Sequence, residues 1–217
     1  MMNFKRQYLW ASNMKIRKLA MNLSNLKHQS SKKVDLEQYS IDGDLAAKWL
    51  SDLIAFGDLK KGCRISDLGA GNGILGIGAI LLGAEKVIFI ESDSDTCEIL
   101  NENLSSLSLN KYSEIQNIHI TQSNIPVLDV DLIITNPPWG RQKEKADKPF
   151  LHTILKNNTT AHILHNHSAT HISNFFLNEG WKVQKYGEAD FSLPATYNHH
   201  NRQRDKTRAG FWRVSPD

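Results

Sequence analysis

Apolar residues recur at helical spacing in two segments near the start of the chain. Residues 14–27 place isoleucine and leucine three to four positions apart and keep a basic face, which predicts an amphipathic helix. A second pattern of this period runs from Leu45 to Ile54 and follows Asp44, a residue type that begins helices. Two helices are therefore expected ahead of Gly62.

From Gly62 onward, short apolar runs alternate with helical patterns. Strands are expected at residues 63–69, 86–91, 118–122, 130–135, 161–165, 181–186 and 211–214. Helices are expected at residues 74–82, 95–107 and 168–178, the second of them capped by Ser94 or Asp95. Apolar strands that alternate with helices belong to a parallel sheet covered on both faces. The pattern predicts a doubly wound α/β fold.

Composition excludes several classes of protein. The 217 residues are 40% hydrophobic and 23% charged, which is typical of a globular domain and not of a disordered, collagen-like or coiled-coil chain. The longest uncharged apolar stretch, residues 68–84, is interrupted by glycines and too short to span a bilayer. Cys63 and Cys97 lie in unrelated contexts and are expected to be buried thiols, which favours a cytoplasmic location without membrane attachment.

The net charge of +3 hides an uneven distribution. Residues 1–34 hold eight basic residues and no acidic one, residues 35–140 hold six basic and sixteen acidic residues, and residues 141–217 hold twelve basic and seven acidic residues. Basic ends around an acidic middle indicate that the termini contact a polyanion such as RNA. A solvated lysine-rich tail is the alternative for residues 1–13.

A glycine-rich turn stands between the first expected strand of the sheet and its helix. The sequence DLGAGNGILG places Gly69, Gly71 and Gly73 where a backbone can approach a ligand at the start of a helix. Dinucleotide enzymes and methyltransferases that use S-adenosylmethionine share this need. Glu91 ends the next strand, where its carboxylate can accept hydrogen bonds from both ribose hydroxyls of such a cofactor.

The fourth strand ends in the sequence Asn136-Pro137-Pro138-Trp139. The amino group of a purine or an amide is a poor nucleophile because its lone pair is delocalised. The Asn136 side-chain oxygen and the Pro137 carbonyl can each accept one of its N–H bonds and so hold the lone pair toward a methyl sulfonium. Pro138 stiffens the turn, and Trp139 is expected to stack on a flat base.

These motifs resemble those of a known family. LEQYSIDGDLAAKWL, DLGAGNGILGIGA, FIESDSD, NPPWG and SLPATYNHHNRQR occur in the order and approximate spacing of the methyltransferase-like protein 5 family. Members of that family methylate the adenine N6 of one small-subunit ribosomal RNA adenosine. The similarity covers about residues 14–215, so residues 14–217 are expected to form one methyltransferase domain with an N-terminal helical segment, and residues 1–13 a dispensable extension.

The resemblance implies a fold, a cofactor and a partner. The fold is a seven-stranded Rossmann-like class I methyltransferase sheet whose last strand is antiparallel. The cofactor is S-adenosylmethionine, and the residues implied to bind it are Gln38, Gly69, Gly71, Asn72, Ile74, Glu91, Asn124 and Ile125. Catalysis falls on residues 136–139. The partner is a small zinc-ribbon activator protein that adds a strand to the sheet.

Three positions depart from the family pattern. Ile41 stands where a threonine is usual, so a hydroxyl contact to the cofactor is missing unless Ser40 supplies it. Asn124 replaces an aspartate that meets the adenine amine, and its oxygen accepts without charge assistance. Trp139 replaces a more frequent phenylalanine and enlarges the aromatic surface.

Two histidine-containing segments invite a functional interpretation. His162, His165, His167 and His171 lie within ten residues, but no cysteine is near and an alternating strand points His162 and His165 to opposite faces, so no metal site is expected and RNA contacts are favoured instead. The late basic segment combines aromatic and cationic groups as a contact to single-stranded RNA would, or else is an exposed hairpin. Its expected RNA-binding residues are Tyr197, His199, His200, Arg202 and Arg204.

The sequence therefore predicts an S-adenosylmethionine-dependent adenine N6 methyltransferase of ribosomal RNA. One alternative is a protein glutamine N5-methyltransferase, because the same turn can hold an amide nitrogen. Another is a cofactor-binding rRNA assembly factor whose chemistry is dispensable. A dehydrogenase would use the glycine turn but leaves residues 136–139 without a purpose.

Overall fold

The computed structural model describes residues 16–28, 41–140, 144–192 and 206–217. Its helices are α2 (Ile16–Ser24), α3 (Gly43–Phe56), α4 (Ile74–Leu81), α5 (Ser94–Ser106), the short 3-10 helix η2 (Asn110–Tyr112), α6 (Lys148–Asn157) and α7 (Thr170–Asn178). Its strands are β1 (Arg64–Leu68), β2 (Lys86–Glu91), β3 (Ser113–Asn117), β4 (Leu132–Thr135), β5 (Ala161–Asn166), β6 (Lys182–Ser192) and β7 (Lys206–Ser215).

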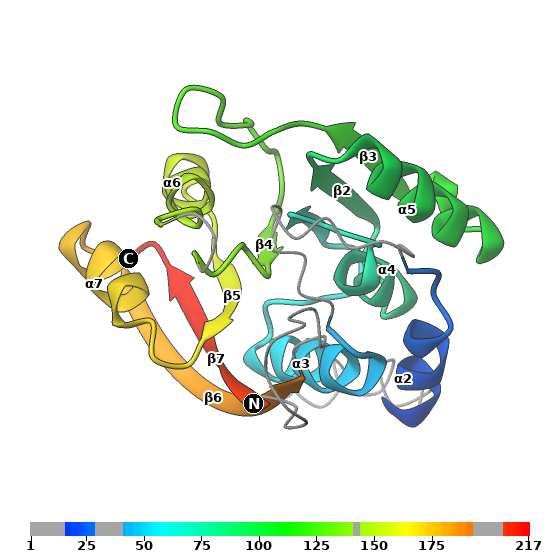
Figure 1. Cartoon of the computed structure of the whole chain (residues 1–217), viewed down its shortest axis with the longest axis horizontal. Coiled ribbons are helices and arrows are strands. Elements are labelled where there is room, and N and C mark those ends of the chain that lie inside the picture. Colours follow the sequence, from blue (N-terminus) through cyan, green and yellow to red (C-terminus); the bar gives the residue numbers. More distant parts are fainter. Residues whose placement is uncertain (1–15, 29–40, 141–143, 193–205) are drawn as a thin grey trace, which may run out of the picture.

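The strands form one seven-stranded sheet in the order β3-β2-β1-β4-β5-β7-β6 (Figure 1). β1 pairs in parallel with β2 and β4, β2 with β3, and β4 with β5. β7 runs antiparallel to both of its neighbours, β5 and β6. The predicted doubly wound α/β sheet with an antiparallel last strand is confirmed.

Helices cover both faces of the sheet and bury two apolar clusters. One cluster joins α2, α3, α4 and α5 to one face of the sheet, with Leu23, Leu50, Ile77 and Phe89 among its fully buried members. The other joins α6 and α7 to the opposite face through residues such as Ile154. Central strands that are buried on both faces explain the continuous apolar runs of the sequence.

Some boundaries differ from those that the sequence predicts. Residues 118–122 are not a strand: β3 lies earlier, at Ser113–Asn117, because Ile118 donates the last backbone bond to Glu91 and the chain then turns between Thr121 and Asn124. Asp42, and not Asp44, caps α3 by accepting from the Leu45 N–H at 2.7 Å. Asp93 occupies the cap position of α5, ahead of Ser94 and Asp95.

A polar network ties the end of α3 to the last strands. Asp58 accepts from the Arg213 guanidinium at 2.6 and 3.0 Å and lies 2.9 Å from His162 Nε2. His162 Nδ1 lies 2.8 Å from the hydroxyl of Tyr186, which accepts from the indole of Trp49 at 2.7 Å. Burial acts to raise the pKa of Asp58, but the bonds from His162 and Arg213 outweigh it and lower the pKa to about 2.

Within the described ranges, every helix is too short or too polar to cross a membrane.

Candidate active site

Strand register gathers the three main motifs at one edge of the sheet. Leu68 lies opposite Ile90 in β2 and opposite Thr135 in β4. Gly69 and Asn136 directly follow β1 and β4, Glu91 is the last residue of β2, and the parallel strands bring the three side by side. The strand order reverses at β1, between β2 and β4, and this is where α/β sheets bind ligands beyond the carboxyl ends of their strands.

The glycine turn has a backbone that other residues adopt poorly. Gly69, Gly71 and Gly73 have φ values of +70°, +57° and +87°. A Cβ on Gly73 would lie 2.2 Å from Leu100 Cδ1, so this glycine is needed for close packing against α5. A Cβ on Gly71 would meet nothing within 4 Å. The turn is thus tightly packed at Gly73 and open at Gly71, which leaves room for a ligand above its backbone.

Asp67 stabilises the glycine turn by a hydrogen bond to the first turn of α4. Its side chain is buried and accepts from the Gly76 N–H, in the first turn of α4, at 2.9 Å. Burial, with the Glu91 charge as a smaller contribution, raises the pKa of Asp67 to about 8, although the Gly76 bond acts in the opposite direction. Gly73, the cap residue of α4, has no side chain, so Asp67 satisfies a helix N–H that the cap cannot.

Glu91 is 7% exposed and organises the turn through its carboxylate. Oε2 accepts from the Gly71 N–H at 2.8 Å, and Oε1 accepts from the Ser92 and Asp93 N–H groups at 2.8 and 3.0 Å. A carboxylate oxygen accepts about two hydrogen bonds, so Oε2 keeps capacity for a hydroxyl beside the glycine turn. The ribose assignment of Glu91 stays a prediction that this geometry fits.

The remaining predicted cofactor residues occupy different environments. Asn72 donates to the Lys27 carbonyl at 3.0 Å and so joins the turn to the segment after α2. Ile74 is buried as the first residue of α4, and Ile41 is buried at 3% exposure in the apolar core. Gln38 lies outside the described residues.

Asn124 and Ile125 follow a tight turn beyond β3. The Asn124 amide nitrogen donates to the His119 carbonyl at 3.1 Å, and its backbone N–H donates to the Thr121 hydroxyl at 3.0 Å. This arrangement directs the amide nitrogen into the turn and leaves the side-chain oxygen as the group that can accept from an adenine amine. Asn124 is exposed and Ile125 is half-buried.

The Asn136–Trp139 turn departs from expectation at its last residue. Asn136 and Pro138 are half-buried, and Pro137 is buried. Trp139 is only 7% exposed: its indole N–H donates to Asn136 Oδ1 at 3.2 Å, and its ring stacks on that of His165 with centroids 5.8 Å apart. The stacking surface predicted for a base is therefore already occupied by His165.

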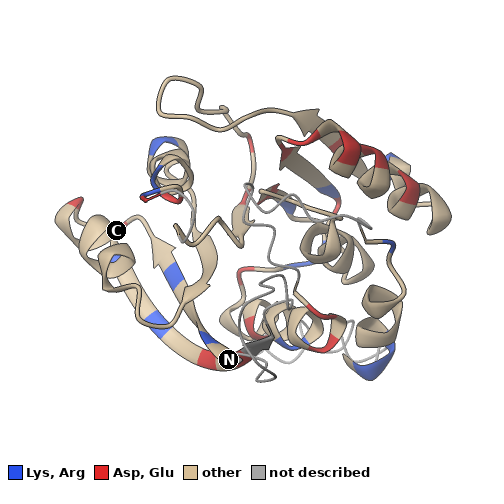
Figure 2. Ribbon diagram, in the orientation of Figure 1, with Lys and Arg blue, Asp and Glu red and all other residues tan. Residues whose placement is uncertain are grey.

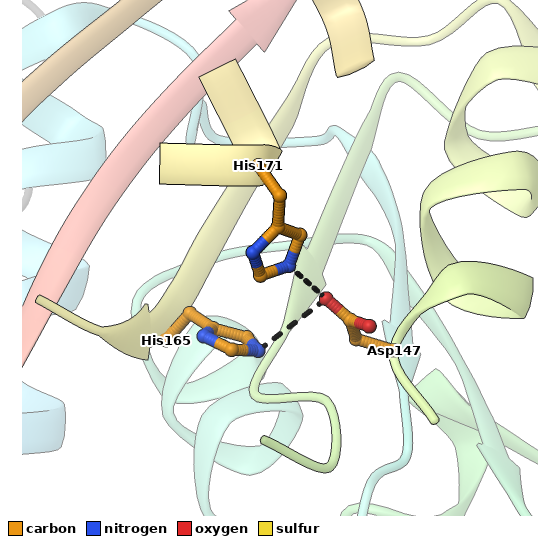
Figure 3. Close-up of side chains that lie close together, drawn as sticks. All are labelled: Asp147, His165 and His171. Carbon is orange, nitrogen blue, oxygen red and sulfur yellow. Dashed lines mark hydrogen bonds and ion pairs between the residues drawn. The ribbon is translucent and has the colours of Figure 1, made fainter. Parts of the chain in front are cut away.

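The histidines of β5 and α7 belong to two different groups. His162 lies in the Asp58 network, whereas the Nε2 atoms of His165 and His171 lie 3.5 and 2.5 Å from Asp147 Oδ2 (Figure 3). His162 and His165 are buried, so the RNA contacts expected of them are wrong in this structure; His167 and His171 are partly exposed.

Sequence reasoning did not find the Asp147 cluster, because Asp147 precedes His165 by eighteen residues and the intervening helix α6 was not predicted. Burial acts to raise the pKa of Asp147, but the His171 bond and the His165 charge outweigh it and leave the pKa lowered. The predicted RNA-binding residues, Tyr197, His199, His200, Arg202 and Arg204, lie outside the described part of the chain.

Comparison with known proteins identifies the family. The family described as Conserved hypothetical protein 95 matches residues 50–194. An uncharacterized protein of Methanocaldococcus jannaschii is 35% identical over 193 residues, covering 85% of this chain and 87% of the relative. The rRNA N(6)-adenosine-methyltransferase METTL5 of Danio rerio is 27% identical and covers 94% of this chain and 100% of its own. The chain belongs to the Conserved hypothetical protein 95 family and is METTL5-like.

A solved structure agrees with this. A Pyrococcus horikoshii protein described as a candidate RNA methyltransferase superposes with a TM-score of 0.82 at 30% identity, over 93% of this chain and 98% of its own. The METTL5-like chain is thus a methyltransferase, and its methyl donor is S-adenosylmethionine.

The residues present fit that cofactor. The open backbone at Gly71, the buried Glu91 carboxylate and the side-chain oxygen of the exposed Asn124 supply space, an acceptor for hydroxyls and an acceptor for an amine. Bound at this edge, S-adenosylmethionine supplies an electrophilic methyl group. The chain's own residues would bind and orient the cofactor there, and Asn136, which follows the adjacent strand β4, would meet the second reactant.

Proposed function

We propose that this METTL5-like enzyme transfers the methyl group to the N6 amine of an adenosine in small-subunit ribosomal RNA. The observation that carries the proposal is the position of Asn136, which directly follows β4 beside the glycine turn and Glu91. Its side-chain oxygen and the Pro137 carbonyl are two acceptors for the two N–H bonds of an exocyclic amine. The names of the METTL5 relatives support an adenosine of ribosomal RNA as the acceptor.

In this proposal Asn136 acts on the substrate amine and not on the cofactor. When the Asn136 side-chain oxygen and the Pro137 carbonyl each accept one N–H bond of the amine, its nitrogen lone pair is held toward the methyl group and the nitrogen becomes more pyramidal. The amine of a paired adenine is inaccessible inside a duplex, so the target adenosine must be single-stranded or flipped out. In this proposal Trp139 does not stack on the base, because its ring is covered by His165. Instead, its indole N–H fixes the Asn136 amide.

Charge supports RNA as the substrate. Figure 2 shows acidic residues along α5, basic residues on α2 and β7, and residues of both charges along β6. β6 and β7 lead into residues 193–205, where Tyr197, His199, His200, Arg202 and Arg204 are proposed to contact RNA. A glutamine amide has no need of this basic flank. Together with the two free thiols, Cys63 and Cys97, the same features support a cytoplasmic site of action.

Product analysis tests the reaction. The purified chain is incubated with isotopically labelled S-adenosylmethionine and, in separate reactions, with small-subunit rRNA, large-subunit rRNA, tRNA and a protein fraction. We expect labelled N6-methyladenosine in small-subunit rRNA alone. Methylglutamine in the protein fraction would support the alternative enzyme, and product in another RNA would refute the small-subunit assignment.

A variant separates an enzyme from a scaffold. Asn136→Ala removes one of the two acceptors for the amine and should lower the transfer rate by about 10²-fold while calorimetric cofactor affinity stays within a factor of two, roughly. Asn117→Ala is a control, because Asn117 bonds the Glu91 backbone carbonyl and lies at the neighbouring strand end. Cofactor binding with no transfer in wild type or either variant would favour the assembly factor.

We also propose a small zinc-ribbon activator that adds a strand at β3. Among the described residues β3 pairs only with β2, and Glu114 is its one charged residue. β6, the other edge strand, carries Lys182, Lys185, Glu188 and Asp190, and charges of this kind discourage pairing. Ile115→Pro should abolish co-purification with the activator from the same source, whereas Val183→Pro in β6 should not. Full solubility and activity of the lone chain, with no gain from the activator, would contradict this proposal.

A further inference from the structure

Three side chains converge beside the Asn136–Trp139 turn from three different elements. Asp147 stands at the start of α6, His165 near the end of β5, and His171 in the first turn of α7. Figure 3 shows the two imidazoles pointing at the same carboxylate oxygen, with their Nε2 atoms at 3.5 Å for His165 and 2.5 Å for His171. One ligand atom from each residue lies within 4.8 Å of the other two.

The distances are close to those of a metal centre. Zinc binds imidazole nitrogen and carboxylate oxygen at about 2.0–2.2 Å, so tetrahedral ligand atoms lie about 3.4 Å apart. The 3.5 Å between His165 and Asp147 already matches this spacing. The His171 contact has to open by less than about 1 Å, and the His171 side chain is 52% exposed and able to make this adjustment.

Burial distinguishes this cluster from ordinary surface ion pairs. The side chains of Asp147 and His165 are only 5% and 2% exposed, so two of the three ligands are held inside the protein. Trp139 stacks on the His165 ring and fixes its plane. The partly exposed His171 forms the entrance, through which an ion can enter and a water can complete its coordination.

We propose that Asp147, His165 and His171 bind one divalent transition-metal ion, with Zn²⁺ the best match. Two neutral imidazoles and one carboxylate suit zinc, copper, iron or nickel better than magnesium or calcium, which take oxygen ligands. Such an ion joins the starts of α6 and α7 to β5 directly behind Trp139. It therefore braces the turn that holds Asn136, without contacting the substrate or the methyl donor. The inference rests on these side chains alone and does not depend on which RNA the enzyme methylates.

Metal titration of the full chain tests the proposal. The protein is stripped with a chelator, dialysed and titrated with Zn²⁺ in a calorimeter and with Co²⁺ in a spectrophotometer. We expect one equivalent of Zn²⁺, and for Co²⁺ the visible absorption of a four- or five-coordinate ion. Zn²⁺ should also raise the unfolding temperature of the wild type.

Matched variants locate the ion. His171→Ala removes the most exposed ligand, with little risk to folding, and should weaken Zn²⁺ binding at least tenfold and abolish the rise in unfolding temperature. Asp147→Asn keeps the side-chain size and should weaken binding by at least as much. His167→Ala is the control, because His167 is also partly exposed but lies 4.0 Å from Glu188 and outside the cluster.

The variants also exclude binding elsewhere, since His199 and His200 offer imidazoles of their own. Zn²⁺ binding that persists in both His171→Ala and Asp147→Asn, or that falls equally in His167→Ala, would overturn the assignment. So would a wild type that binds no Zn²⁺ or Co²⁺. None of these results bears on whether the enzyme makes N6-methyladenosine, which is measured separately.

Discussion

The indole N–H of Trp139 donates a 3.2 Å hydrogen bond to the side-chain oxygen of Asn136, the residue proposed to hold the substrate amine. A phenylalanine, the more frequent family residue at this position, has no such donor. The bond directs the Asn136 amide from within the turn, and Trp139 itself belongs to the buried apolar core. In this chain the aromatic residue is thus a positioning residue for Asn136.

Trp139→Phe tests this role. The variant keeps an aromatic ring against His165 but loses the bond, worth about 1 kcal/mol, so we expect kcat to fall about fivefold with KM for RNA nearly unchanged. Trp139→Ala should instead lower the free energy of unfolding by about 3–5 kcal/mol, because it opens a cavity. Steady-state kinetics and urea unfolding check both. An increase of KM alone in Trp139→Phe would show that the ring stacks on the substrate.

Glu91→Gln separates cofactor binding from the architecture of the glycine turn. The amide keeps one oxygen for backbone N–H groups but loses the charge that strengthens bonds from ribose hydroxyls, so cofactor affinity should fall at least about tenfold. Glu91→Ala would also remove the acceptor of the Gly71, Ser92 and Asp93 N–H groups. A loss of cofactor binding could then not be distinguished from a change in the structure of the turn. Calorimetry with S-adenosylmethionine checks this, with Glu98→Gln on the exposed face of α5 as control. An unchanged affinity would defeat the ribose assignment.

Asp67 predicts a specific pH dependence of stability. Its folded pKa of about 8 lies above the unfolded value of about 3.9, so the folded state binds the extra proton. This contribution is fully present below about pH 4 and is lost as the pH rises toward about 8, with a slope of up to about 1.4 kcal/mol per pH unit. Asp67→Asn can still accept from Gly76 and does not ionise, so it should be more stable than wild type near neutral pH.

Urea unfolding at several pH values between about 5 and 8 measures this difference. The stability gap between Asp67→Asn and wild type should widen as the pH rises. Asp95→Asn, on the exposed first turn of α5, is the control and should follow the wild-type curve. Parallel curves for wild type and Asp67→Asn would contradict a raised pKa.

The proposed domain boundary predicts that residues 1–13 are dispensable. The buried face of α2 begins at Leu19, so a chain that starts at Met14 keeps every α2 contact with the core. Its free energy of unfolding should lie within about 0.5 kcal/mol of the full chain, and its activity should be unchanged. A chain that starts at Lys27 loses Leu19 and Leu23 and should be strongly destabilised. Loss of folding or activity in the Met14 chain would refute the boundary.

The central strands of the sheet were predictable because a strand that is buried on both faces has a continuous apolar sequence. β2 and β4 are continuous apolar runs, and both were predicted within one or two residues. β3 was misplaced because SEIQN is a half-exposed edge strand, whereas the more apolar segment that follows contributes Ile118 and Ile120 to the core without pairing in the sheet. An apolar segment is expected to be buried, but a buried segment is not always a strand of the sheet. The two coincide at β2 and β4 and differ at Ile118 and Ile120.

The site was predictable where function depends on position along a strand. Gly69, Glu91 and Asn136 each lie at or directly after the end of a strand, and parallel register alone brings them together. The partner of Trp139 was not predictable, because whether a tryptophan faces solvent or a histidine depends on the path of the next strand. Asp147 was missed for the same reason, as was α6, whose start carries Lys148 and Pro149 before its apolar positions.

The contact between Asp58 and Arg213 has a consequence for the order in which the chain matures on the ribosome. α3 is synthesised long before β7, yet Asp58, two residues after the end of α3, receives its guanidinium partner from β7. β7 also lies between β5 and β6, so β6 can join the sheet only after β7 has been made. Until Arg213 leaves the exit tunnel, the nascent chain holds an incomplete sheet with an exposed β5 edge. Of the seven strands that the structure describes, the last to be translated is therefore the one that joins β6 to the rest of the sheet.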